Sequence, residues 1–539
     1  MSVVTPDLLR ALPNSAEFFN PSQNRHFSVT VRDGRLYEAE WETDGNGNDV
    51  FRETQAVEWL IGAGANGVGA LVRRGDRIFE APLTYYAKLR SWALSPGYED
   101  ADRGFSRPID AGCISCHSGQ PNPSSEYAGK FNTPPFEELA VGCENCHGPG
   151  EAHILKMHQN KPDADATDTS IVNPGKIPSW LADNICMSCH QTGDARVRQA
   201  GKTFQDFRPG QPLDHTLALL MVPFTPEAPP RTDLVQQYLS MQLSKCYRNT
   251  DGKMSCVTCH NPHVQPSSDE APAYYREKCL SCHTAASCKL PLEARQKTAP
   301  ADNCIGCHMP KRDVAEISHA SLTNHRIVTT PDEPFPDATF HLATRALPDI
   351  VHIDAIPNHE DLVPPLTLLQ AYGQLGAEHR EYMPRYFEIA QQLQATAPNN
   401  TDVLEALAAQ ALQIKTPEGD RAAISYLGKA IAGGSSTAWD FESLGSKLLQ
   451  ARELTNAISC LRTGLERAPY DAKIYTLLAE GYMAENKRDE AAAILTRALQ
   501  LFPQMDLLRA FLEQVRRPHP PTKHVSSSNY DGGNGRNKN

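Results

Sequence analysis

One five-residue pattern, Cys-x-x-Cys-His, occurs six times in this chain. It occupies Cys113–His117, Cys143–His147, Cys186–His190, Cys256–His260, Cys279–His283 and Cys304–His308. Two intervening residues place both thiols on one short turn, from which they can add to the two vinyl groups of one porphyrin. The histidine that follows then lies under the iron. The pattern therefore predicts six covalently attached haem c groups.

This interpretation gives a role to every cysteine and histidine of the six motifs. The thioether bonds are predicted for Cys113, Cys116, Cys143, Cys146, Cys186, Cys189, Cys256, Cys259, Cys279, Cys282, Cys304 and Cys307. The proximal iron ligands are predicted to be His117, His147, His190, His260, His283 and His308. A zinc knuckle or a dithiol redox site also uses Cys-x-x-Cys. Neither alternative explains why histidine follows all six pairs.

Six irons with two axial positions each call for as many as six further ligands. Histidines outside the motifs in this half of the chain are His26, His153, His158, His215, His263, His319 and His325. His153 and His263 each lie within six residues of a proximal histidine, so we expect each to bind a neighbouring iron rather than the nearest one. Haems joined in this way pack closely, which permits electron hopping. His158 and His215 are more typical of surface residues, and Met309 more readily ends a local turn than binds iron.

Composition narrows the classes of partner. The 539 residues carry a formal charge of −12, and 40% are hydrophobic with 7% aromatic, which is lean for a globular chain of this length. Haem propionates would add further negative charge, so nucleic acid is not an expected partner. No stretch approaches the 18 or more apolar residues of a membrane span.

Twelve of the fifteen cysteines belong to the motifs, which leaves Cys246, Cys288 and Cys460. At least one of these thiols stays free or pairs with another chain, and a disulfide between Cys246 and Cys288 remains open. The first residues do not form a signal peptide. Because haem c attachment generally takes place outside the bacterial cytoplasmic membrane, we expect a periplasmic or extracellular protein, with the export signal upstream of Met1 or removed from a truncated product.

The expected architecture is mainly α. Residues 1–110 read as the N-terminal, β-containing part of the haem domain, with a small region of hairpins at Phe27–Trp41 and Leu71–Phe79. Gly62-Ala-Gly-Ala-Asn-Gly67 matches a dinucleotide fingerprint but lacks the strand-helix-strand context, so we interpret it as a turn. Residues 111–330 form the predicted hexahaem cytochrome domain, which has little regular structure between motifs and is organised by its cofactors.

The rest of the chain divides at residues rich in proline and aspartate. Residues 331–362 read as a linker, and 363–515 follow the 34-residue period of tetratricopeptide repeats, an α-helical solenoid. In the clearest repeat the expected positions are Tyr475, Leu478, Ala479, Tyr482, Ala491, Leu495, Ala498 and Pro503. The tail 516–539 is predicted to be disordered.

Six stretches together carry a resemblance to a known family: Trp92–Tyr98, Ile109–His117, Gly142–Gly150, Cys246–His263, Asp302–Pro310 and Ser318–Ile327. From about residue 20 to 510 the chain resembles bacterial multihaem cytochromes c with C-terminal tetratricopeptide repeats. Its haem part is similar to the tetrahaem cytochrome of ammonia oxidisers and to multihaem nitrite and hydroxylamine enzymes. The resemblance implies distal iron ligation by His153, His263, His319 and His325. His26 and His215 are weaker candidates that rest on the residues alone. The family usually has a further Cys-x-x-Cys-His before the position of Phe18, and this chain lacks it.

The leading hypothesis is electron transfer. Six haem c groups would relay electrons between redox partner proteins, and the repeats would dock a partner or another copy of the chain. The alternative is an oxidoreductase in which one haem has an open axial site and reduces nitrite, hydroxylamine or a sulfur oxyanion. In a third hypothesis, the repeats carry the main function and the haems serve only to stabilise the structure. The first predicts that every iron is six-coordinate.

Overall fold

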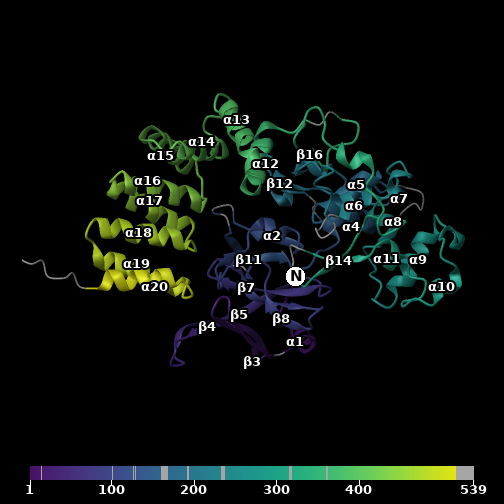
Figure 1. The fold of residues 1–539 in the computed structure, drawn as a ribbon, viewed down its shortest axis with the longest axis horizontal. Helices are drawn as coiled ribbons and strands as arrows, with labels where there is room; N and C mark the ends of the chain where they lie inside the picture. The colour runs from purple at the N-terminus through teal and green to yellow at the C-terminus, as the bar shows by residue number, and fades with distance from the viewer. Residues whose placement is uncertain are drawn as a thin grey trace, which may run out of the picture.

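The structure, a computed structural model, describes residues 1–517 except 14, 100, 125–126, 128, 160–167, 191–192, 232–236, 315–318 and 360–361. The prediction of a disordered tail falls largely on residues outside this description. Three regions follow one another along the chain: an antiparallel sheet, the segment that carries the six motifs, and a stack of helices (Figure 1). No helix in the described ranges is both long and apolar enough to cross a membrane.

The first region is a nine-stranded antiparallel sheet in which consecutive strands pair from β2 to β8, while β1 pairs with β5 and β9 with β7. Its elements are β1 Ser2–Val3, α1 Pro6–Ala11, β2 Ser15–Asn20, β3 Arg25–Arg32, β4 Arg35–Thr43, β5 Asp49–Ile61, β6 Gly67–Arg74, β7 Arg77–Tyr86, β8 Ser91–Leu94 and β9 Arg107–Pro108. Alternate residues point to one face, so Phe27 and Val29 of β3 join Phe79, Ala81 and Leu83 of β7 in one core.

The prediction of a mainly α protein with only a small hairpin region is therefore wrong. The predicted hairpins at Phe27–Trp41 and Leu71–Phe79 coincide with β3–β4 and β6–β7, whereas the strands that extend them into one sheet, β1, β2, β5, β8 and β9, were not predicted. Glu38 and Glu40 of β4 are 0% and 1% exposed, and the Glu38 carboxylate accepts a hydrogen bond from the Leu83 N–H at 2.9 Å. The glycine-rich stretch does form the turn between β5 and β6, with φ of 113° at Gly62.

We call residues 111–330 the motif segment. Its helices are short: α2 Ala111–Ser115, α3 Glu144–His147, α4 Glu151–Gln159, α5 Ser179–Met187, α6 Gln237–Gln242, α7 Lys245–Arg248, α8 Cys256–Cys259, α9 Ala271–Leu280, α10 Leu292–Gln296 and α11 Cys304–His308. Its strands are β10 Gln120–Pro123, β11 Phe131–Glu138, β12 Ala195–Arg198, β13 Leu217–Met221, β14 Lys311–Asp313 and β15 Ser321–Thr323. Thus regular structure does occur between the motifs, although in small pieces.

The segment predicted as a linker has a packing role. Its strand β16 Val351–His352 pairs with β13, and buried Leu347 and Ile350 join the core beneath the first repeat helices. The three strands β12, β13 and β16 therefore connect the motif segment to the repeats.

The C-terminal region is a stack of antiparallel helices (Figure 1). They are α12 Pro365–Glu378, α13 Met383–Leu393, α14 Thr401–Gln413, α15 Pro417–Ala432, α16 Ala438–Gln450, α17 Leu454–Arg467, α18 Ala472–Ala484, α19 Arg488–Leu501 and α20 Asp506–Arg516. The helices α16, α18 and α20 begin 34 residues apart, which confirms the predicted repeat period. A Cβ on Gly445 would lie 2.5 Å from the side chain of Leu461, so this position needs glycine for the helices to approach.

The repeats contact the sheet where two arginines of the sheet donate hydrogen bonds to the C-terminal ends of two repeat helices. Arg77 donates to the carbonyl of Arg467 at 2.9 Å, and Arg74 donates to the carbonyl of Leu501 at 3.1 Å. These carbonyls end α17 and α19, where a cation is favourable. The Tyr470 hydroxyl donates in return to the carbonyl of Arg74 at 3.1 Å. The edge of the solenoid that holds these helix ends is thus covered by the same chain.

Candidate cofactor-binding site

Each motif lies on a short helix or at the end of one. A helical turn brings residues three apart to the same side, so the two cysteines of a motif face one way. Side-chain acceptors fix the start of some of these turns. Asp110 accepts from the Cys113 N–H at 3.0 Å, and Asn303 accepts from the Gly306 N–H at 3.2 Å. The local geometry is therefore compatible with attachment of both thiols to one ring.

Two proximal histidines are held by the same two-point contact. His147 Nδ1 lies 2.7 Å from the carbonyl of Val172, whose N–H donates to the carbonyl of His147 at 3.0 Å. His308 Nδ1 lies 2.7 Å from the carbonyl of Val328, whose N–H donates to the carbonyl of His308 at 3.1 Å. A carbonyl at Nδ1 fixes the tautomer in which Nε2 has the free lone pair, as in most metal-bound histidines.

Three further histidines have a partner at Nδ1. It is the Tyr275 hydroxyl for His260 at 3.2 Å and the Thr323 carbonyl for His325 at 3.0 Å. For His153 it is the carboxylate of Asp168 at 2.5 Å. The sequence patterns did not identify these partners, because each lies 2 to 15 residues from its histidine at a position that no motif fixes.

Two pairs of imidazoles lie at a distance that suits one metal ion between them. The ring centroids of His147 and His263 are 5.9 Å apart, and those of His260 and His325 are 6.1 Å apart. Two imidazoles on opposite sides of one metal have centroids roughly 6 Å apart, since each metal–nitrogen bond is about 2 Å and each nitrogen lies about 1 Å from its centroid. Each pair joins one proximal histidine to one predicted distal histidine.

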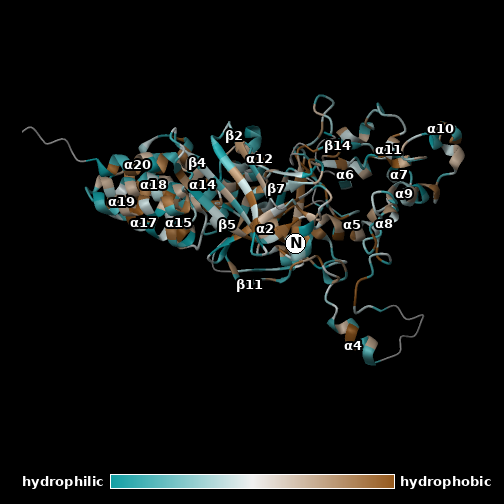
Figure 2. Ribbon diagram, turned by 90° about the horizontal axis from the view of Figure 1, so that it is seen from below, coloured by the Kyte–Doolittle hydropathy of each residue, from teal (hydrophilic) through white to brown (hydrophobic). Residues whose placement is uncertain are grey.

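The other predicted distal histidines lie elsewhere. His319 contacts the ring of Tyr86 at 5.1 Å, and His26 packs on Trp41 of the sheet at 5.1 Å. His215 ends a 3-10 turn and is exposed. His153 lies on α4, which stands away from the rest of the motif segment (Figure 2). Ring contacts between described residues join none of these four to a proximal histidine.

Burial, the largest cause in each case, lowers the pKa of the imidazoles of His117, His190, His260 and His325. It favours the neutral imidazole, which is the form that binds a metal. Burial also raises the pKa of the Cys279 thiol to about 11.

The donor set fits haem better than zinc. A structural zinc ion takes four protein ligands, yet within the described ranges no three side chains of His, Cys, Asp or Glu come together where they could hold one ion. A haem iron needs only two protein ligands, as the imidazole pairs provide. The structure has no disulfide among its fifteen cysteines, and Cys246 is not joined to Cys288.

Several helices of the motif segment bury no side chain: α3, α4, α8, α9, α10 and α11. Apolar side chains on these helices face outward, among them Ile154 at 54%, Leu155 at 51% and Val257 at 37% exposed. The hydropathy colouring of Figure 2 shows hydrophilic and hydrophobic residues next to one another along α4. A porphyrin packed on these surfaces would provide the apolar contacts that the side chains lack.

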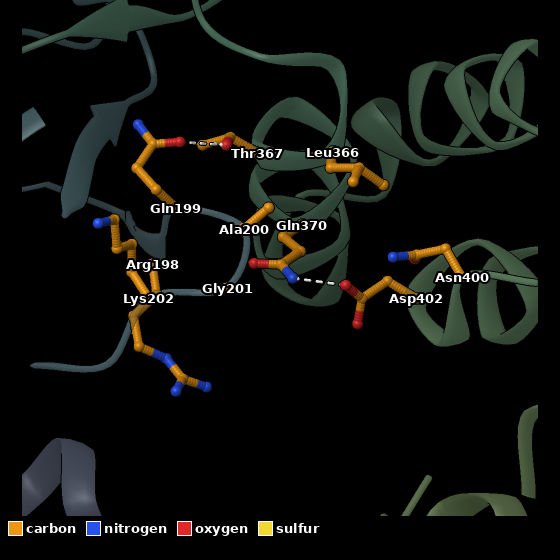
Figure 3. A pocket seen from close by; sticks show the side chains of 10 residues that line it. All are labelled: Arg198, Gln199, Ala200, Gly201, Lys202, Leu366, Thr367, Gln370, Asn400 and Asp402. Carbon is orange, nitrogen blue, oxygen red and sulfur yellow. Dashed lines mark hydrogen bonds between the residues drawn. The ribbon is translucent and has the colours of Figure 1, made fainter. Parts of the chain in front are cut away.

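A cavity of about 290 Å³ lies where the motif segment meets the repeats, between the turn after β12 and the first turns of α12 and α14. The Thr367 hydroxyl donates to Gln199 at 2.6 Å, and Gln370 donates to Asp402 at 2.7 Å (Figure 3). The side chains of Arg198 and Lys202 extend away from these pairs (Figure 3). Because the charged side chains that line this cavity do not point toward one another, we interpret it as a gap in the packing between the two regions and not as a second binding site.

Comparisons with known proteins give only partial matches, and these are to solved structures. No family model matches the chain, and no curated protein matches it. Among solved structures it is similar to a thermophilic TPR protein of Thermus thermophilus, at 22% identity, with 28% of this chain and 81% of that chain covered and a TM-score of 0.23. It is also similar to MamA, at 20% identity over 26% of this chain and 74% of that chain, with a TM-score of 0.23.

Proposed function

We propose that this chain is a multihaem c-type cytochrome that relays electrons between redox partner proteins outside the cytoplasm. Six haem c groups would be attached at the six motifs, with the motif histidines as proximal ligands. When bound, haem iron supplies reversible one-electron chemistry. The helical repeats would dock a partner protein or another copy of the chain, since stacked repeats form extended binding surfaces.

The observation that carries this proposal is the pairing of imidazoles. The ring centroids of His147 and His263, like those of His260 and His325, lie at the spacing expected of two ligands on one iron. The Nδ1 atoms of His147 and His325 each lie next to a backbone carbonyl, as expected of iron ligands. Backbone carbonyls at Nδ1 of His147 and His325 hold these two rings in place and leave their Nε2 atoms free to bind. Two strong axial ligands keep an iron six-coordinate, which suits electron transfer rather than binding of a substrate.

The function can be tested on protein matured with its haem, by electron paramagnetic resonance of the oxidised form. His263→Ala should convert one low-spin iron to high-spin, because His147 then has no partner, and His325→Ala should do the same at the iron of His260. His215→Ala is the matched control, since His215 is exposed, and should leave every signal unchanged. Low-spin signals that persist in both test variants would contradict the proposed ligand pairs.

A second candidate function is reduction of a small substrate at one haem with an open axial position. It is favoured by one observation: ring contacts between described residues join only His147 and His260 of the proximal histidines to a second imidazole. Cyanide titration of the oxidised protein separates the two functions. A relay with six-coordinate irons should bind none, whereas an open site should bind about one equivalent per chain.

A further inference from the structure

Arg326, in the turn that follows β15, is a buried cation without an anionic partner. It is only 7% exposed, and its Nη2 donates to the carbonyls of Glu333 and Pro334 at 2.7 and 2.5 Å. Among the described residues its Nε has no hydrogen-bond acceptor, and no carboxylate forms an ion pair with it. The carboxylate of Glu333 itself pairs with Lys245 at 3.3 Å. Buried charges are normally paired with opposite charges, so the site around Arg326 lacks an anion.

Arg25, a buried arginine of β3, shows what Arg326 lacks. It is 5% exposed and also donates to a backbone carbonyl, that of Gln504, at 2.9 Å. In addition it pairs with the carboxylates of Asp102 at 2.8 Å and Glu42 at 2.5 Å. The charge of Arg25 is thus balanced within the protein, whereas the two carbonyls at Arg326 supply no net charge. An anion for Arg326 therefore has to come from a bound group.

The turn that holds Arg326 lies between two of the predicted haem sites. His325, which directly precedes Arg326, pairs with His260 of the fourth motif at a centroid distance of 6.1 Å. Two residues after Arg326, the carbonyl of Val328 lies 2.7 Å from Nδ1 of His308 in the sixth motif. The same short turn thus serves an imidazole of the fourth-motif iron and one of the sixth-motif iron. A haem at either motif would lie next to this turn.

The guanidinium group is held in place by the polypeptide alone. The Arg326 N–H donates to the side-chain oxygen of Asn324 at 2.9 Å, and the Asn324 N–H donates to the carbonyl of Pro310 at 3.2 Å. The guanidinium carbon of Arg326 lies 3.9 Å from the ring centroid of Phe335, a cation–π contact. Backbone, side chain and ring therefore fix the cation in position before any anion binds, which favours binding.

We propose that Arg326 binds a propionate group of the haem at the fourth or the sixth motif. Every haem carries propionate carboxylates at one edge, and arginine pairs with carboxylates through strong, charge-assisted hydrogen bonds. The inference rests on the proposed function, since it requires haem at these motifs. The positive charge of Arg326 also favours the reduced haem, which has one more electron than the oxidised haem. Arg326 therefore raises the reduction potential of the haem whose propionate it binds.

The test uses full-length matured protein, with intact mass to count the haems and a spectroelectrochemical titration to give their midpoint potentials. Arg326→Gln should keep six haems and lower the midpoint potential of one of them, because the cation is removed. Arg326→Lys keeps the positive charge and should return that potential toward the wild-type value. Arg312→Gln is the matched control, since it removes the same charge from an exposed position on β14, and should leave every potential unchanged.

Removing one haem at a time identifies the propionate. If it belongs to the sixth-motif haem, Arg326→Gln should have no effect in a Cys304→Ser, Cys307→Ser background. If it belongs to the fourth-motif haem, the effect should disappear in a Cys256→Ser, Cys259→Ser background instead. An effect that survives in both backgrounds would overturn the assignment to these two haems.

Failure of this inference differs from failure of the proposed function. A wild type without haem overturns the function, whereas a six-haem Arg326→Gln protein with wild-type potentials overturns only the role of Arg326. If Arg326→Gln does not take up its haems, a structure of the matured wild type decides. A propionate oxygen within about 3 Å of the Arg326 guanidinium would support the inference. A free phosphate or sulfate ion there, or no anion at all, would overturn it.

Discussion

The motif segment and the helical repeats are stabilised in different ways, although both consist largely of short elements. In the repeats, Phe441, Leu461, Tyr475 and Leu495 are each 0% exposed and fill the space between neighbouring helices. In the motif segment, helices α8 to α11 bury no side chain at all. Periodic apolar residues predict the contacts between side chains in the repeats, whereas the cysteines and histidines of the motif segment predict bonds to the haem that we propose.

The largest expected effect follows from removing that cofactor. When the protein is made in a compartment without haem attachment, residues 244–310 should lose protection of their backbone amides, because little else buries them. Residues 365–516 should stay protected, since the repeats have their own core. Hydrogen exchange measured by mass spectrometry on the haem-free and matured forms gives this contrast. Equal protection of 244–310 in both forms would remove the difference between the two regions.

A core substitution in the repeats should have the next largest effect. Leu461→Ala deletes a side chain that is 0% exposed, and should lower the free energy of unfolding of the repeats by about 2 to 5 kcal/mol. Leu507→Ala is the matched control, because Leu507 is 80% exposed. Urea unfolding followed by helical circular dichroism measures both. The visible absorption of the matured protein should be the same in the two variants, and a loss of it would show that the regions fold as one unit.

The smallest effect concerns the sheet, through the carboxyl group of Glu80 on β7. Burial, opposed by Arg107 and Arg103, raises the pKa of Glu80 from 4.5 to about 6. Between these values the folded protein binds more protons than the unfolded chain, so its stability falls as pH rises through this window, by on the order of 1 to 2 kcal/mol. Above about pH 6 this group adds no further change.

Glu80→Gln should therefore flatten the dependence of stability on pH between about 4.5 and 6. Thermal melts of both proteins at a series of pH values test this. Parallel curves across the window would show that Glu80 titrates in the folded protein as it does in the unfolded chain.

The repeats could be predicted from the sequence because the residues that define them lie close together in the chain. The period that separates Ala438 from Ala472 was visible in the spacing of small and apolar residues. The sheet was underestimated because a nearly buried carboxylate such as Glu53 of the missed strand β5 looks like a surface residue until its distant partner, Arg74 at 3.7 Å, is known.

Within the candidate site, the sequence predicted which residues would bind the cofactor but not which groups would contact them in the folded chain. The role of His147 follows from its motif, but the carbonyl of Val172 that holds its ring belongs to a residue without any distinguishing side chain. The pairing of His260 with His325 joins positions 65 residues apart, a distance that no spacing rule reveals. Asp183 precedes its own motif by three residues, yet it contacts the next motif.

Both the contrast between the regions and the proposed relay depend on thioether-bound haem at the six motifs. The most direct measurement is the intact mass of the protein matured in a host that attaches haem c, together with a proteolytic map of the modified peptides. We expect six haem adducts, one at each Cys-x-x-Cys-His motif between Cys113 and His308. A colourless protein with unmodified cysteines, or one that holds zinc at these cysteines, would contradict the account.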